Sequence, residues 1–285
     1  MPAVIANYSF SFNGQVFGGT GSPYQIQSVD GLEALPDIRS QDDNRGYADG
    51  MFSGRDFLSG REIVIQFLCL ASTGASAQAN FNTIQRALLP QQSGTTPLYF
   101  LMSNADSEQV VYARVRGLRA TVDPNYTYGY IVAQVTFFCP DPNVYASNIQ
   151  TATLAYTPPT GRVYNRTYNV NYGGGSVIIS TTINNAGWAT TYPNIAISGP
   201  ITNPTVGNTT EGAALNFIGT YSSSDVLNVD LYNKLITLNG NPARNTLLSG
   251  TWFSAQPGNN QFYLTGTGTL AGTTQAVVTW QSAYI

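Results

Sequence analysis

The stretch Ile63-Val64-Ile65-Gln66-Phe67-Leu68-Cys69-Leu70 decides the fold class of this chain. Its odd-numbered residues are all apolar, and its even-numbered residues are apolar except for Gln66. A period of two indicates a β-strand, and apolar side chains on both faces indicate a strand in the interior of a sandwich. The stretch therefore predicts a β-protein with a central strand over residues 63–70.

Two neighbouring segments extend this sheet. Residues 111–116 alternate between apolar and larger polar side chains, and residues 131–139 alternate in the same way. Each segment has one apolar face, which is typical of a strand with one side on the core. We expect both to be strands.

A single helix is predicted over residues 76–89, between the strand at residues 63–70 and the strand at residues 111–116. Ala77, Phe81, Ile84 and Leu88 recur at helical spacing, Ser76 is the expected N-cap, and Pro90 ends the segment. The first domain, residues 1–146, is therefore expected to be a β-sandwich with one helix.

The alternation breaks at Pro140-Asp141-Pro142, which predicts a domain boundary between residues 140 and 147. Pro158-Pro159-Thr160-Gly161 and Gly173-Gly174-Gly175 then bracket a stretch of weak periodicity. Short strands follow, separated by turn signals: Ile195 with Ile197, Leu215 with Phe217, Leu227 with Val229 and Leu231, Ile236 with Leu238, Phe262 with Leu264, and Ala276 to Trp280. Residues 147–285 are expected to form a second β-sandwich, so that the chain is mainly β.

Charged residues make up only 9% of the chain, against roughly 25% in ordinary soluble domains. Asn, Gln, Ser, Thr and Tyr must then form most of the surface, which suits permanent protein contacts because these groups are cheaper to desolvate than ions. The net charge is −3 with Lys234 as the single lysine, which argues against nucleic acid as a partner. With no signal-like start and no run of about 18 apolar residues, we expect neither export nor membrane insertion.

Catalytic residue types are sparse. The chain has no histidine, which excludes imidazole-based catalysis and His-ligated zinc. Glycosidase chemistry needs only two carboxylates, and Asp141, Glu211, Asp225 and Asp230 are the candidates, but nothing in their spacing selects a pair. We interpret them as turn and strand-end acids and expect no enzyme and no catalytic residues.

No cofactor or metal site is expected. Gly18-Gly19-Thr20-Gly21 and Gly173-Gly174-Gly175 neither open a predicted helix nor precede Lys and Ser or Thr, so they predict turns and not phosphate loops. Asp42-Asp43-Asn44 with Asp49 resembles the start of a calcium loop, but Gly46 is out of register and no Glu follows at the needed position.

Three tryptophans and two cysteines leave alternatives open. Trp188, Trp252 and Trp280 suit sugar stacking or core and interface packing. Cys69 and Cys139 each end an alternating run, and a disulfide between them is neither required nor excluded.

A family resemblance is carried by an ordered set of short motifs. In the second half these are residues 194–204 (NIAISGPITNP), Asn208-Thr209-Thr210-Glu211-Gly212, residues 226–230 and 236–240, and Trp252-Phe253 before Pro257-Gly258-Asn259-Asn260. In the first half they are Tyr8-Ser9-Phe10 before Asn13-Gly14, residues 29–32, Asp49-Gly50, Gly54, Arg61 and Asp141-Pro142. The set resembles the distal tail proteins of siphophages, although Ser224 and Gln256 stand where that family tends to have Gly and a hydrophobic residue.

The resemblance implies a structural virion protein. Its N-terminal sandwich would assemble as a homohexameric ring that continues the tail tube, and a galectin-like C-terminal sandwich would project outward. Tail-tube, tail-tip and receptor-binding proteins would be its partners, and the phage tail tip its location, after synthesis in the host cytoplasm. Residues 39–57 are the candidate for an extended arm to a neighbouring subunit, or else an ordinary long loop.

Three other functions compete with the hub. They are a carbohydrate-binding module that holds a host-wall glycan, a carboxylate-only hydrolase of the tail tip, and a major tail-tube subunit.

Overall fold

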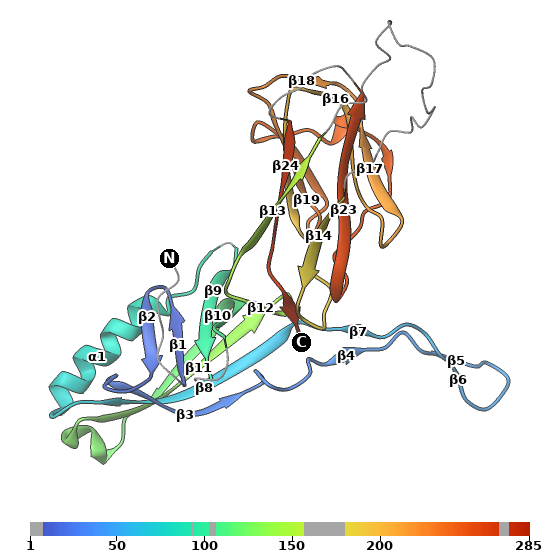
Figure 1. Cartoon of the computed structure of the whole chain (residues 1–285). Helices are drawn as coiled ribbons and strands as arrows, with labels where there is room; N and C mark the ends of the chain where they lie inside the picture. Colours follow the sequence, from blue (N-terminus) through green and yellow to red (C-terminus); the bar gives the residue numbers. More distant parts are fainter. Residues whose placement is uncertain (1–7, 93, 103–106, 157–179, 268–273) are drawn as a thin grey trace, which may run out of the picture. The chain divides into compact units, whose positions relative to one another are not determined.

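The computed structural model of the chain describes residues 8–92, 94–102, 107–156, 180–267 and 274–285. The chain forms two compact units, residues 1–148 with Ile285 and residues 149–284 (Figure 1). The boundary expected from the sequence lies two residues earlier, between residues 146 and 147. Both units are built mainly from β-strands, which confirms the predicted fold class.

The first unit is a β-sandwich made from one continuous path of strands, ordered β2-β1-β9-β10-β11-β8-β3, with β12 beside β10. The bounds are β1 (Ser9–Phe12), β2 (Gln15–Gly18), β3 (Tyr24–Asp30), β8 (Arg61–Leu70), β9 (Thr96–Leu101), β10 (Gln109–Thr121), β11 (Tyr130–Cys139) and β12 (Val144–Ala146). A short 3-10 turn, η1 (Pro124–Tyr128), joins β10 to β11.

Strand β10 lets this path fold over on itself. Its first part pairs with β9 as far as Ala113, its second part pairs with β11, and a bulge lies between Val115 and Gly117. The two halves then face each other, since the ring centroids of Phe12 and Phe137 are 5.0 Å apart and those of Phe17 and Phe67 are 5.4 Å apart. These aromatic contacts join the halves into one core.

The stretch that decides the fold is β8. It pairs with β11 on one side and β3 on the other, which confirms that it is an interior strand. Its odd-numbered side chains are all buried from Arg61 to Cys69, whereas the even-numbered side chains of Val64 to Leu70 are partly exposed. The predicted strands at residues 111–116 and 131–139 are confirmed as parts of β10 and β11.

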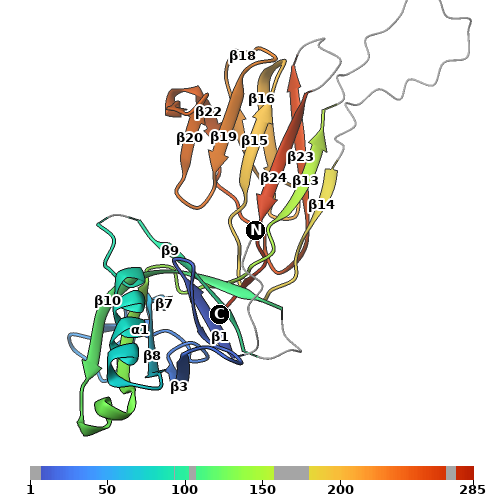
Figure 2. The ribbon, with the colours of Figure 1, turned by 90° about the vertical axis from the view of Figure 1, so that its left-hand side faces the viewer.

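The predicted helix is α1 (Gly74–Ala87), which packs beside β8 and β11 (Figures 1 and 2). Its buried residues are Gly74, Ala77 and Ile84, and its C-cap residue Leu88 is also buried. The predicted N-cap was wrong: Thr73 caps the helix, and its Oγ1 accepts a hydrogen bond from the backbone N–H of Ser76 at 3.2 Å. Helix formation can start before Ser76 because Gly74 takes the crowded first position next to Tyr126, where a Cβ would lie 2.5 Å from a carbonyl oxygen.

The second unit is a β-sandwich of two six-stranded sheets. One has the order β13-β24-β15-β19-β20-β21, and the other has the order β14-β23-β16-β17-β22 with β18 beside β16. The first sheet contains β13 (Gln150–Ala155), β15 (Asn194–Ser198), β19 (Val226–Asp230), β20 (Leu235–Leu238), β21 (Asn241–Pro242) and β24 (Gln275–Trp280). The second contains β14 (Ser180–Asn185), β16 (Ile201–Asn208), β17 (Ala213–Phe217), β18 (Thr220–Tyr221), β22 (Leu247–Gly250) and β23 (Gly258–Thr267), while η2 (Arg244–Thr246) and β25 (Ala283–Tyr284) complete the unit.

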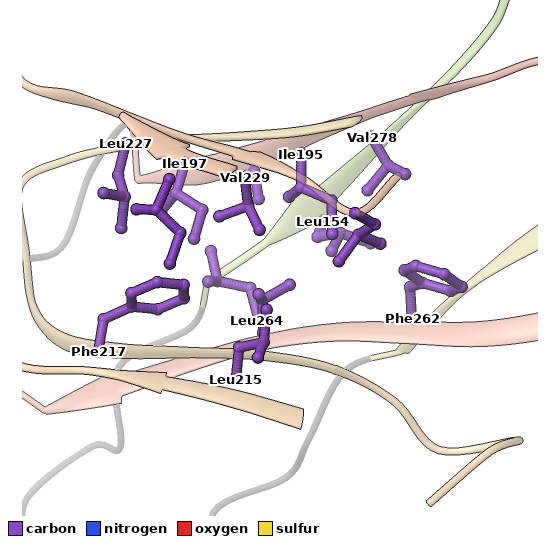
Figure 3. Packing of buried hydrophobic residues seen from close by; sticks show 14 of the residues in the cluster. Leu154, Ile195, Ile197, Leu215, Phe217, Leu227, Val229, Phe262, Leu264 and Val278 are labelled. Carbon is purple, nitrogen blue, oxygen red and sulfur yellow. The ribbon is translucent and has the colours of Figure 1, made fainter. Parts of the chain in front are cut away.

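The core of the second unit lies between these sheets. Figure 3 shows Ile195, Ile197, Leu227 and Val229 of one sheet facing Leu215, Phe217, Phe262 and Leu264 of the other. The apolar residues of all six short strands predicted from the sequence lie in observed strands, except that Leu231 falls one residue beyond the end of β19. The segments Pro158–Gly161 and Gly173–Gly175 lie outside the described residues.

Candidate interaction surfaces

Residues 38–58, called the arm below, form a narrow two-stranded ribbon. At its root β4 (Ile38–Arg39) pairs with β7 (Phe57–Leu58), and nearer its tip β5 (Asp43–Asn44) pairs with β6 (Met51–Phe52) (Figure 1). Every residue from Ile38 to Phe57 is exposed. The segment predicted as an arm or a loop is thus a hairpin, and its contact with a neighbouring subunit stays a prediction.

The arm exposes apolar side chains. Tyr47 is fully exposed, Phe52 is 60% exposed and Met51 is 53% exposed. Two arginines lie over aromatic rings of the arm, with Arg45 at 5.1 Å from the Phe52 centroid and Arg39 at 5.7 Å from that of Phe57. Such a surface, without its own core, is typical of a segment that contacts another protein.

Two aspartates of the arm accept hydrogen bonds from its backbone. Asp42 accepts a hydrogen bond from the Gly54 N–H at 2.8 Å, which together with a bond from Ser40 lowers the pKa of Asp42. Gly54 lies so close to Gln41 that an added Cβ would be 2.1 Å from its carbonyl oxygen. Asp43 accepts a bond from the N–H of Asn44. No cluster of three or more metal-binding side chains occurs among the residues that the structure describes.

Arg61, which follows the arm in sequence, binds the segment that precedes the arm, residues 31–34. It is 1% exposed, and its Nη1 lies 2.6 to 3.0 Å from the carbonyl oxygens of Gly31, Leu32 and Ala34. Its Nε donates to the carbonyl of Pro142 at 3.1 Å. Burial lowers the pKa of this guanidinium. The four carbonyl oxygens around it compensate for the loss of water, so the buried side chain keeps its positive charge. The burial of Arg61 was predictable in part, since it shares the odd-numbered register of the apolar residues Ile63 to Cys69.

The four candidate carboxylates each accept hydrogen bonds from uncharged groups. Asp141 belongs to the first unit and accepts hydrogen bonds from the Asn143 N–H and the Tyr145 hydroxyl. Asp225 is held in a turn by Ser222 and Asn239, whose hydrogen bonds lower its pKa. Asp230 accepts from the N–H groups of residues 232 and 233 in the next turn, and Glu211 lies elsewhere in the second unit. Asp141, Asp225 and Asp230 therefore each hold a turn or strand end, as the sequence predicted, whereas the partners of Glu211 are distant in sequence.

Two of the family motifs meet at Glu211. Its carboxylate accepts hydrogen bonds from the hydroxyl and backbone N–H of Ser254 and from Gln256 Nε2, which is 2.7 Å away. Beneath it, the fully buried Asn208 donates to the Ser254 carbonyl, and the fully buried Asn260 donates to the Gln256 carbonyl. This polar cluster joins residues 208–211 to residues 254–260 across more than 40 positions of sequence. Its hydrogen bonds fix the backbone that follows Trp252-Phe253.

The tryptophans have different environments. Trp280 is buried, and its Nε1 donates to the Asn184 carbonyl at 2.9 Å. Trp252 is partly covered by the Arg244 guanidinium, 5.2 Å from the ring centroid, whereas Trp188 is 66% exposed. Packing therefore explains Trp280, and only Trp188 presents most of its ring to solvent.

A pair of exposed tyrosines in the second unit was not predicted. Tyr192 and Tyr232 lie with their ring centroids 5.8 Å apart and are 43% and 49% exposed. They come from the segment before β15 and the turn after β19, which are adjacent because those two strands pair. No local sequence pattern brings these two residues together.

Both cysteines are free and buried. Cys69 lies opposite Ile131, and Cys139 lies opposite Arg61 at the other end of the same strand pair. Eight residues of a strand separate them by about 27 Å, far beyond disulfide reach. The alternative of a disulfide within the chain is therefore excluded.

Two other sequence features are settled by the backbone. Gly18, at the end of β2, and Gly19 and Gly21, in the loop after it, all have positive φ, which confirms a turn. No helix among the described residues is long and apolar enough to cross a membrane.

Comparisons with known proteins connect this architecture to phage tails. Residues 186–284 match the family described as "Siphovirus-type tail component, C-terminal domain". A search of curated proteins found no match. Among solved structures, the Dit protein of phage SPP1, described as a paradigm of the hub adsorption apparatus in phages that infect Gram-positive bacteria, has a TM-score of 0.67 at 16% identity, with 97% of this chain and 99% of that chain covered.

Chains of the phage P2 baseplate in its activated conformation are also similar. The structure with Ca gives a TM-score of 0.51 at 11% identity over 95% of this chain and 97% of that chain. The structure with Sr gives 0.50 at 12% identity over 95% and 96%. The match of residues 186–284 and the likeness to SPP1 Dit confirm the resemblance of this chain to siphophage distal tail proteins.

Proposed function

We propose that this chain is a structural, non-catalytic hub of a siphophage tail, which forms a homohexameric ring at the far end of the tail tube. The observation that supports this most is the family match of the second unit, combined with a likeness to the SPP1 Dit fold over 97% of the chain. In this proposal the first unit builds the ring and continues the tube. The second unit, a galectin-like sandwich, attaches tail-tip and receptor-binding proteins.

The surface chemistry supports an assembly role. Only 9% of residues are charged, so strands and turns present mostly amides and hydroxyls. These groups are desolvated at modest cost when they find hydrogen-bond partners across an interface. The arm adds exposed aromatic side chains, the residue type enriched in the centres of interfaces.

Purified full-length protein tests the ring. Light scattering is expected to give a particle with six times the 30.6 kDa mass of the chain, and negative-stain electron microscopy is expected to show closed rings with a central hole. A strict monomer at all concentrations, or an open filament, would contradict the proposal. A filament would instead favour the tail-tube subunit, because stacked copies propagate along an axis.

Carbohydrate binding is a second candidate, favoured by the exposed aromatic side chains Trp188, Tyr192 and Tyr232 in the second unit. Aromatic rings of this exposure stack on sugar rings in lectin-like sites. Full-length protein would be applied to an array of bacterial wall glycans, beside a Tyr232→Ala variant. Binding that the variant loses would support a glycan site, and no binding by the native chain would remove this candidate.

A further inference from the structure

We propose that the outer face of the sheet β14-β23-β16-β17-β22 in the second unit binds an uncharged polysaccharide. The inference rests on the carbohydrate-binding candidate, for which it names another binding face and the class of glycan, and it is independent of the ring. Three properties of this face carry it: the absence of charge, the pairing of amide and hydroxyl side chains across strands, and a tyrosine ring that leans over a glycine.

The strands of this sheet present alternate residues to the core and to the outside (Figure 1). In β23 the side chains of Phe262 and Leu264 are buried in the core, whereas those of Gln261 and Tyr263 are partly exposed on the other side. Five neighbouring strands at a spacing of about 4.8 Å make an outer face about 19 Å wide. This width accommodates several linked sugar rings.

The sheet carries no charge. Among the described residues, none of its six strands contains Asp, Glu, Lys or Arg. A ligand with phosphate, sulfate or carboxylate groups would find no opposite charge here, and the net charge of −3 of the chain would repel it. The hydroxyl groups of a neutral sugar instead exchange water for amides and hydroxyls at little cost. The face therefore favours an uncharged polysaccharide over an anionic wall polymer.

Amide and hydroxyl side chains on this face are paired in rows across neighbouring strands. In one row Gln261 Nε2 donates to Thr182 Oγ1 at 2.8 Å. In another, Thr205 Oγ1 donates to Asn216 Oδ1 at 2.9 Å, and Asn216 Nδ2 donates to Ser249 Oγ at 3.2 Å. These bonds orient the side chains before a ligand arrives, so that less rotamer entropy is lost on binding. An amide has two N–H groups and two lone pairs on its oxygen, which leaves capacity for sugar hydroxyls.

Tyr263 lies between these two rows and is in register with Gly207 of β16. A Cβ at Gly207 would be 2.7 Å from both Cε1 and the hydroxyl oxygen of Tyr263, so the end of the ring takes the place of a side chain there. The ring therefore leans across β16, a position in which one of its faces serves as a platform for a sugar ring. Gln261, about 7 Å away along β23, is placed to bind hydroxyl groups of the same glycan.

Affinity electrophoresis of the full-length protein tests the class of ligand. Native gels would contain neutral polysaccharides with glucose, galactose, mannose or rhamnose backbones, and one gel would contain polyglycerol phosphate as an anionic polymer. We expect a neutral polysaccharide to slow the migration of the protein and the anionic polymer to have no effect. Unchanged migration in every neutral gel, or retardation by the anionic polymer alone, would overturn the inference.

Variants of the face locate the site. Tyr263→Ala removes the ring and is expected to weaken binding about tenfold, whereas Tyr263→Phe keeps the ring and should retain the affinity. Gln261→Ala is expected to weaken binding about fivefold. The matched controls are Tyr232→Ala, in the turn after β19, and Asn228→Ala, on the outer face of the other sheet.

Tryptophan fluorescence in urea would establish that each variant is folded. If Tyr263→Ala is unfolded, Gln261→Ala and its control Asn228→Ala decide the outcome. Full affinity in folded Tyr263→Ala, or an equal loss in Tyr232→Ala, would overturn the inference. Equal affinity of Gln261→Ala and Asn228→Ala would also contradict it.

A protein partner on the same face would give a different result in the phage. Particles that carry Tyr263→Ala are expected to have tails of normal composition and to adsorb more slowly to the host. Loss of tail-tip proteins from these particles would indicate a protein contact and overturn the inference. Light scattering tests the hub separately: a native chain that binds the neutral polysaccharide but forms no hexamer would contradict the ring and leave the glycan site in place.

Discussion

Arg61 ties two loops of the first unit to the start of β8. Its hydrogen bonds reach four carbonyl oxygens, in residues 31–34 and at Pro142. We expect Arg61→Met to leave these carbonyls without a donor and to destabilise the loops by about 3 kcal/mol. Hydrogen exchange of peptides that span residues 31–37 would then be faster. Arg114→Met, at an exposed position of β10, is the control, and equal exchange in both variants would contradict the role of Arg61.

Glu211 makes an independent prediction in the second unit. Glu211→Gln keeps the size of the side chain but removes the charge that strengthens its bonds from Ser254 and Gln256. We expect a loss of about 1 kcal/mol in the free energy of unfolding. All three tryptophans lie in this unit, so tryptophan fluorescence in urea reports its unfolding. The matched control, Glu62→Gln on the exposed face of β8, should leave that transition unchanged, and an equal shift would contradict the role of Glu211.

The burial of both cysteines predicts how their reactivity depends on pH. Since burial raises the pKa of Cys69 and of Cys139 to about 12, on the order of one thiol in 10,000 is ionised at pH 8. A folded pKa above the unfolded value of about 8.5 stabilises the fold below pH 8.5, and this contribution is lost as the pH rises toward 12. A thiol reagent at pH 8 should label neither cysteine until denaturant is added. Rapid labelling of the native protein would show that the strand pair β8 and β11 is open.

At the scale of elements, α1 shows why a helix can be predicted while its start is missed. The spacing of Ala77, Ile84 and Leu88 depends only on which face meets the core, and it gave the correct element. The cap depends on a local choice between Thr73 and Ser76, which Gly74 decides by its contact with Tyr126. Tyr126 is distant in sequence, so this contact has no local signal.

The cap itself can be tested. Thr73→Ala removes the acceptor of the Ser76 N–H, and we expect it to destabilise the helix by about 1 kcal/mol. Ser76→Ala, which keeps that backbone N–H, should have a much smaller effect. Amide exchange in peptides of α1 compares the two, and a larger effect of Ser76→Ala would restore Ser76 as the cap.

Strands were predictable where one face alone is buried. The alternation in β11 and β15 is visible in the sequence because the core selects every second residue. Strand β16 shows the opposite case. Pro204 interrupts its pattern, and the structure accommodates it at a bulge between Thr202 and Thr205, where the ladder needs no donor. The short ribbons of the arm have no core and therefore no periodic signal.

At the scale of the whole molecule, composition and the order of motifs predicted the class of function, whereas no individual side chain predicted an interaction surface. The scarcity of charge and the absence of histidine favoured assembly over catalysis, and the ordered motifs indicated the phage tail family. The interaction surfaces were less predictable, because Tyr192 and Tyr232, or Tyr263 and Gly207, come together only through strand pairing. The cluster at Glu211 was partly predictable, since both of its motifs could be recognised in the sequence but their contact could not.

The position of this protein on the virus particle is the central claim, and immunogold electron microscopy of the source particles measures it directly. An antibody raised against residues 147–285 would carry the gold. Label confined to the far end of the tail tube, just above the tip, is the predicted result. Label along the whole tube would mean a tube subunit, and label on no particle would contradict a structural role in the virion.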